Sequence, residues 1–152
     1  IGYPDRETER DVLNNHRDGE PVDRLKPVIS ADDLATAQGE ARAVRVDESI
    51  NEYLLDVVTA TRSHAELSLG VSTRGAITLH RAVQSFAYCE GRDYVIPDDI
   101  KRLAGPVLAH RGSVFRREGH DLLSGLGMIQ EGQRERAQAV IAEILDTTRV
   151  PA

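Results

Sequence analysis

The most informative part of the sequence for the fold is residues 72–91, which read STRGAITLHRAVQSFAYCEG. Apolar side chains recur within it at the spacing of one helix face. They are Ala76, Leu79, Val83, Phe86 and Ala87. Ser72 is a favourable N-cap, and Gly91 stands where a glycine commonly ends a helix. These signals predict an amphipathic helix from Ser72 to about Glu90.

Three more helices are predicted before this stretch. The first covers about 6–17 and follows Asp5 as its N-cap, and the second runs from a capping box at Ser30 to about Arg45. The third begins at 47–49 and has a clear amphipathic stripe. This stripe consists of Ile50, Leu54, Val57, Val58 and Thr61. Residues 18–29 and 64–70 are expected to be loops.

Two helices are predicted after it. One opens with Pro97 at its first position, and Gly105 with Pro106 is expected to break or kink it. The last helix has its apolar positions at Ala137, Val140, Ile141, Ile144 and Leu145. Between the two, residues 112–132 contain five glycines and predict a loop or a short hairpin around Val114 and Phe115. The fold class predicted is mainly all-α, a helical bundle with one glycine-rich excursion.

Composition narrows the range of partners. The 152 residues suit a single domain, and 25 acidic against 19 basic side chains give a net charge of −6, which argues against nucleic acid as a partner. No apolar run is long enough to cross a bilayer, so we expect no membrane insertion. One cysteine, Cys89, excludes an intramolecular disulfide and is expected to be a buried small apolar residue. The chain begins at Ile1 without an initiator Met, and we interpret it as a fragment of something longer.

A self-sufficient active site is not predicted. A phosphate-binding loop needs lysine after glycine, but the only lysines, Lys26 and Lys101, follow leucine and isoleucine. The five histidines show no zinc-ligand spacing, so no metal site is expected. The sequence therefore predicts no catalytic residue in this chain; if it serves catalysis, it completes a site held elsewhere.

One position conflicts with local helix chemistry. Arg74 falls at about the second position of the helix that follows Ser72, where a cation opposes the helix dipole. Free backbone amides together with a guanidinium favour an anion, above all a phosphate. The alternative is that Arg74 pairs with a carboxylate of a neighbouring helix.

Five stretches, taken in order, resemble the C-terminal helical lid of the MoxR-type AAA+ ATPases. They are 2–7 (GYPDRE), 69–76 (LGVSTRGA), 91–100 (GRDYVIPDDI), 107–111 (VLAHR) and the tail 144–151. The resemblance covers nearly the whole chain. It differs from the common family pattern at Thr73, often proline, and at Ile96, often a threonine whose hydroxyl caps the next helix.

The resemblance implies an AAA+ lid fold and a share in ATP hydrolysis. In that family a separate α/β core, absent here, carries the phosphate-binding loop and the magnesium-binding acids, so ATP and Mg belong to the full-length protein and neither is expected on the fragment alone. Arg74 would be the sensor-2 arginine that reaches the γ-phosphate, with Ser72 and Thr73 beside it. Tyr3 and Pro4 would lie at the hinge, close to the adenine.

The resemblance also implies partners. These are the chain's own AAA+ core, neighbouring subunits of a ring that is usually hexameric, and a protein with a von Willebrand factor A domain. The implied role is chaperone-like remodelling or maturation of protein complexes in the bacterial cytoplasm. The alternative function is a free-standing helical interaction module, an adaptor without nucleotide. A helix-turn-helix DNA-binding protein is disfavoured because the chain has no positive face.

Overall fold

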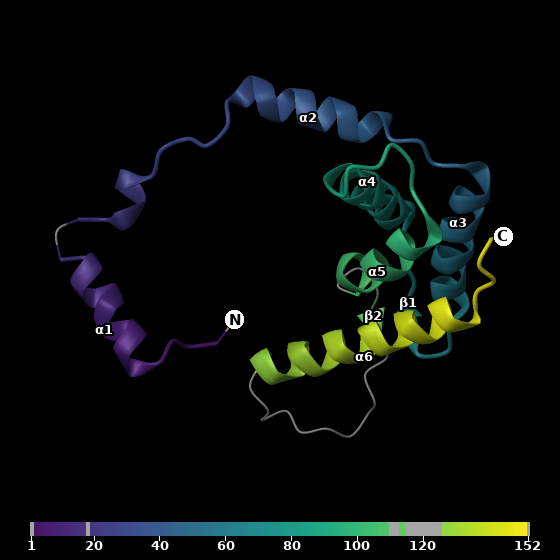
Figure 1. Cartoon of the computed structure of the whole chain (residues 1–152). Helices are drawn as coiled ribbons and strands as arrows, with labels where there is room; N and C mark the ends of the chain where they lie inside the picture. The colour runs from purple at the N-terminus through teal and green to yellow at the C-terminus, as the bar shows by residue number, and fades with distance from the viewer. Residues whose placement is uncertain (1, 18, 110–112, 115–125, 152) are drawn as a thin grey trace. The chain divides into compact units, whose positions relative to one another are not determined.

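The structure, a computed structural model, describes residues 2–17, 19–109, 113–114 and 126–151 (Figure 1). The chain divides into two compact units, residues 1–35 and 36–152, and the division falls inside one helix.

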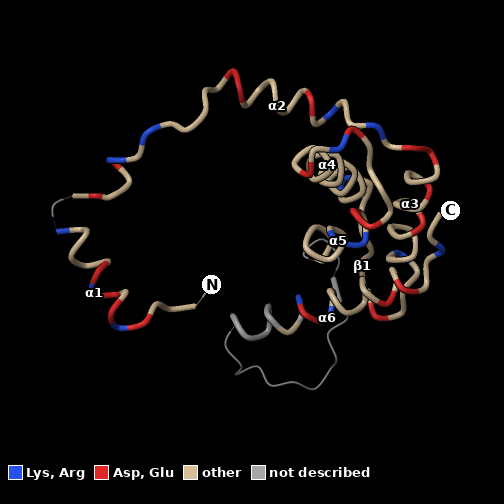
Figure 2. The backbone as a smooth tube through the Cα atoms, viewed as in Figure 1, with Lys and Arg blue, Asp and Glu red and all other residues tan. Residues whose placement is uncertain are grey.

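The first unit contains short helical elements with little burial. Helix α1 (Arg6–Asn15) begins at Asp5, whose carboxylate accepts a hydrogen bond from the Thr8 amide (2.8 Å). It ends two residues earlier than predicted, buries no residue, and carries charges of both signs (Figure 2). A 3-10 turn, η1 (Pro21–Arg24), interrupts the expected loop. Helix α2 (Ala31–Ala43) then starts with the reciprocal Ser30–Asp33 bonds of a capping box, as predicted.

The second unit is a helical bundle. Its helices are α3 (Glu48–Ser63), α4 (Thr73–Cys89), α5 (Pro97–Leu108) and α6 (Leu126–Thr147). Helices α4 and α5 lie side by side, and α3 and α6 pack with them around one aliphatic core (Figure 1). The largest fully buried side chains are Tyr53, Leu79, Ile100, Leu108, Val57, Val58, Val71, Val83 and Thr61. The predicted mainly all-α fold is confirmed, and the whole predicted stripe of α3 is buried.

A small antiparallel sheet corrects two of the predicted loops. Strand β1 (Leu67–Leu69) lies in the stretch predicted as a loop after α3, and it pairs with β2 (Ser113–Val114). Val114 is therefore extended as predicted, but its strand pairs with a distant segment. Helix α6 begins at Leu126, so residues 126–132 are helical and the predicted loop or hairpin at 112–132 is too long. Phe115 and the other residues of 115–125 lie outside the described part.

Two local predictions about α4 and α5 are wrong. The break predicted in α5 is absent: the helix continues through Gly105 and Pro106, because a glycine before proline lacks the Cβ that would clash with the proline ring. The kink given as the alternative stays a prediction. Cys89 is exposed rather than buried. It lies two positions after the buried Ala87, about 200° around the helix, and so falls on the outer face of α4.

Candidate functional site

The predicted phosphate contact lies at the N-terminus of α4. Ser72 is extended and caps the helix, and its Oγ accepts a long hydrogen bond from the Gly75 amide (3.4 Å). The first turn contains no acidic residue. The first-turn amides and the helix dipole therefore favour a negative charge here.

Arg74 is the second residue of α4 and is exposed. Among the residues that the structure describes, it forms no ion pair, so the alternative in which it pairs with a neighbouring helix finds no support there. Ser72 and Thr73 are exposed beside it. The three predicted phosphate-contacting residues thus lie together at one helix start.

The predicted hinge residues lie elsewhere in the chain. Tyr3 and Pro4 precede α1 in the first unit, and both are exposed. Their association with α4 and with a nucleotide stays a prediction.

The loop that leads into α4 is held by α3. The Val71 amide donates to Thr61 Oγ1 (2.9 Å), and the Arg62 Nε donates to the Val71 carbonyl (2.9 Å). Neither contact was predicted, because Thr61 stands in the apolar stripe of α3 and its spacing indicates only a core position. A hydroxyl in that stripe was the available signal.

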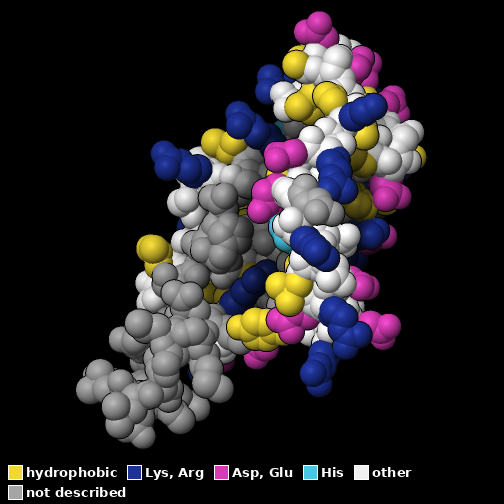
Figure 3. All heavy atoms as spheres, turned by 90° about the vertical axis from the view of Figure 1, so that its left-hand side faces the viewer, with side chains coloured by type: hydrophobic (Ala, Val, Ile, Leu, Met, Phe, Trp, Pro, Cys, Tyr) yellow, Lys and Arg dark blue, Asp and Glu magenta, His cyan; other side chains and the backbone are white. Residues whose placement is uncertain are grey.

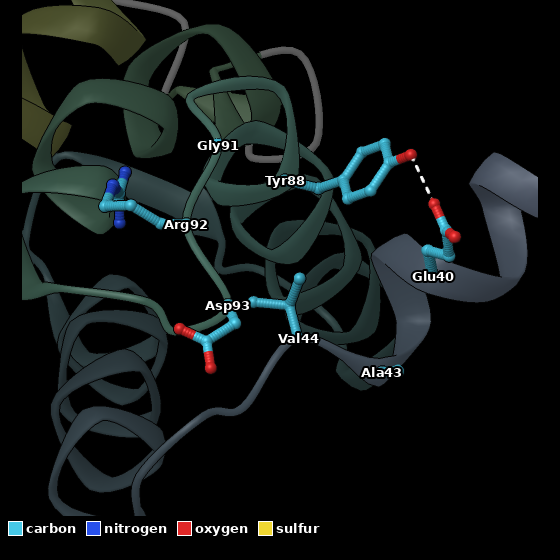
Figure 4. Close-up of a pocket in the computed structure, with 7 residues that line it drawn as sticks. All are labelled: Glu40, Ala43, Val44, Tyr88, Gly91, Arg92 and Asp93. Atoms are coloured by element: carbon cyan, nitrogen blue, oxygen red, sulfur yellow. Dashed lines mark hydrogen bonds between the residues drawn. The ribbon is translucent and has the colours of Figure 1, made fainter.

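A second concave site lies within the second unit, between the part of α2 that belongs to it and the end of α4 (Figure 4). Its volume is about 390 Å³, and its lining residues are Glu40, Ala43, Val44, Tyr88, Gly91, Arg92 and Asp93. The Tyr88 hydroxyl donates to Glu40 Oε2 (2.6 Å), and this hydrogen bond raises the pKa of Tyr88. The Arg92 guanidinium is already paired with Asp99. The Tyr88 hydroxyl and the Arg92 guanidinium are thus both engaged within the protein, so we assign this cleft no catalytic or binding role.

Within the described ranges, no group of His, Cys, Asp or Glu side chains could hold a metal ion. No helix among those residues is both long and apolar enough to span a bilayer. Lys and Arg side chains are interspersed with Asp and Glu on the face seen in Figure 3.

Comparison with known proteins finds relatives of this fold. The family model described as an AAA lid domain matches residues 59–123, which include β1, α4 and α5. The chain is 39% identical over 151 residues to the uncharacterized protein YeaC of Bacillus subtilis, covering 99% of this chain and 43% of that protein. It is 33% identical over 120 residues to the chaperone MoxR1 of Mycobacterium tuberculosis, covering 73% of this chain and 31% of that protein.

A solved structure shares the fold. It is the crystal structure of a protein from Cytophaga hutchinsonii that is described as an ATPase. This chain matches it with a TM-score of 0.72 and 27% sequence identity. The match covers all of this chain and 45% of that one. The chain thus spans less than half the length of the relatives that it matches.

The helical bundle, the small sheet and the exposed start of α4 define an AAA lid domain. The chain is a lid domain of the MoxR type of AAA+ ATPases, as the resemblance indicated.

Proposed function

We propose that this lid contributes Arg74 to an ATP site, where its guanidinium contacts the γ-phosphate of ATP bound on the nucleotide-binding core. One observation carries the proposal: an exposed arginine without a described carboxylate partner stands in a helix first turn that contains no acidic residue. Such an arrangement is unfavourable for the isolated helix and becomes favourable when a phosphate approaches.

Ser72 and Thr73 complete the contact. The backbone amides of the first turn of α4 point out of the helix start, where they can donate to phosphate oxygens. Magnesium and the remaining phosphate ligands would come from the core, since the described part of this chain contains no metal-binding cluster. The lid by itself is not expected to hydrolyse ATP.

The lid would then couple the nucleotide state to movement. ATP between core and lid attracts Arg74 and the start of α4, which closes the lid, and loss of the γ-phosphate releases it. Tyr3 and Pro4 would form the hinge near the adenine. In a ring of subunits, which we expect to be hexameric, this rocking would drive chaperone-like remodelling of a protein complex, with a von Willebrand factor A domain protein as a partner, in the cytoplasm.

The test is Arg74→Ala in the full-length protein that carries this lid. We expect ATP turnover at saturating ATP to fall about 100-fold, the scale seen when one donor to a developing negative charge is removed. The matched control is Arg81→Ala. Arg81 is also exposed on α4, seven residues and about 10 Å further along nearly the same face, so it tests whether position rather than charge matters.

The outcomes separate the candidate functions. Slow turnover in Arg74→Ala with near-normal turnover in Arg81→Ala supports the sensor-2 assignment. Equal turnover in Arg74→Ala and the unaltered protein contradicts it. A full-length protein that neither binds nor hydrolyses ATP would favour the adaptor function without nucleotide.

A further inference from the structure

Val71, the residue before the N-cap of α4, is bonded through both of its backbone polar groups to two consecutive side chains of α3. Its amide donates to Thr61 Oγ1 (2.9 Å), and its carbonyl accepts from Arg62 Nε (2.9 Å). We call Thr61, Arg62 and Val71 the Val71 clamp. Both backbone polar groups of this loop residue are thus satisfied by side chains of α3, which ties the loop to that helix.

The hydroxyl of Thr61 both donates and accepts. Thr61 is 1% exposed, and its Oγ1 donates to the Val58 carbonyl within α3 (2.6 Å) while it accepts from the Val71 amide. The first bond fixes the direction of the hydroxyl hydrogen and leaves a lone pair for the amide. Serine could replace this group, whereas valine, of the same shape, would leave the Val71 amide buried without an acceptor.

The close approach of α3 and the loop before α4 depends on Gly70. A Cβ at Gly70 would lie 2.5 Å from the Arg62 Cα and 2.7 Å from the Arg62 nitrogen. The loop therefore runs against the α3 backbone more closely than a residue with a side chain allows. The Val71 side chain is 1% exposed in the core and fixes the loop from the other side.

We infer that Thr61 and Arg62 are positioning residues for Arg74. The inference rests on the proposed contact between Arg74 and the γ-phosphate. Arg74 follows Val71 by three residues, through the N-cap Ser72, so the clamp determines where α4 begins and where its first-turn amides point. A displacement of about 1 Å at such a site can cost up to about 100-fold in rate.

The experiment uses Thr61→Val and Thr61→Ser in the full-length protein. We expect Thr61→Val to lower kcat for ATP hydrolysis about 10-fold and Thr61→Ser to restore most of it, because serine keeps the hydroxyl. The amide of Val71 should exchange with solvent faster in Thr61→Val than in Thr61→Ser. Val57→Ala, in a fully buried residue of the same helix outside the clamp, controls for a loss of stability alone.

A double variant distinguishes positioning from general destabilisation. If the clamp acts through Arg74, adding Thr61→Val to Arg74→Ala should change kcat by less than about twofold, because the two changes remove one shared effect. Should Thr61→Val fail to fold, Arg62→Met takes its place, since it removes the Nε donor from an exposed residue.

Two failures are distinguishable. If Arg74→Ala slows turnover but Thr61→Val and Arg62→Met do not, or if their effects multiply with that of Arg74→Ala, the clamp inference is overturned and the proposed function stands. If Arg74→Ala leaves turnover unchanged, the proposed function fails, and so does any positioning role that acts through Arg74.

Discussion

Arg92 and Asp99 form a two-bond ion pair that joins the start of the α4–α5 connection to the first turn of α5. The Arg92 Nη1 lies 2.9 Å from Asp99 Oδ2, and Nη2 lies 2.7 Å from Oδ1. The Asp99 side chain is 3% exposed, and its carboxylate also accepts from the Ile96 amide (3.0 Å). Arg92 donates in addition to the Tyr94 carbonyl (2.9 Å). The hydrogen bonds to Asp99 raise the pKa of the guanidinium.

Arg92→Ala should lower the free energy of unfolding by about 3 kcal/mol. Among the described residues, the change leaves the buried Asp99 carboxylate with the Ile96 amide as its one partner, and removing one member of a buried pair costs about 3–5 kcal/mol. We take the lower end because the Arg92 side chain is 22% exposed. Urea denaturation followed by circular dichroism measures the difference.

Arg45→Ala is the matched control for Arg92→Ala. Arg45 pairs with Asp93 at 3.8 Å, but both side chains are largely exposed, so this change should alter stability by less than about 1 kcal/mol. Equal losses in the two variants would contradict the idea that burial of Asp99 makes the Arg92 pair important.

Two glycine-to-alanine changes should act in opposite directions. Gly70→Ala places a Cβ 2.5 Å from the Arg62 Cα, and such overpacking against backbone should cost about 1–3 kcal/mol. Gly39→Ala, inside α2, meets no atom within 4 Å and should stabilise its helix by about 0.5–1 kcal/mol. Thermal unfolding of both variants beside the unaltered chain is the measurement. A neutral Gly70→Ala would show that the loop can move away from α3 without loss.

The bundle could be predicted from sequence because its information is local and periodic. The stripe of α3, the N-cap at Ser72 and the proline at the start of α5 each specify their own helix. Arg74 could be singled out for the same reason, since its conflict with the helix dipole is visible within one turn.

Long-range pairing could not be predicted in this way. Strand β1 is three residues long, and its partner β2 lies more than forty residues later, so neither segment carries a strand pattern of its own. The ion pair of Asp99 with Arg92 could not be predicted for a similar reason. An acidic residue in the first turn of a helix is ordinary, and only the fold places the Arg92 guanidinium against it. Thr61 has the right spacing for the core, and nothing local shows that its hydroxyl would meet the Val71 amide.

Asp47 should make the stability of α3 sensitive to acid. Its carboxylate accepts from the Ser49 amide (2.9 Å) and the Ser49 hydroxyl (2.8 Å), and these bonds, the amide first, hold the pKa of Asp47 below its ordinary value of 3.8. The folded state therefore binds this proton less readily than the unfolded state. The contribution of Asp47 to the free energy of unfolding is complete above pH 3.8, its ordinary pKa. It is lost as the pH falls through the lower pKa of the folded state.

Asp47 is the N-cap of α3, and Asp47→Asn tests this pH dependence because asparagine keeps an N-cap oxygen but does not titrate. Thermal midpoints measured from about pH 6 down to about pH 2 should fall less steeply in Asp47→Asn than in the unaltered chain, with the difference confined to the acid end. Glu52→Gln, a change within α3 away from the cap, should leave the slope nearly unaltered. Parallel curves for Asp47→Asn and the unaltered chain would mean that the Ser49 bonds do not distinguish the charged carboxylate from a neutral cap, and the acid sensitivity of the chain would then come from its other carboxylates.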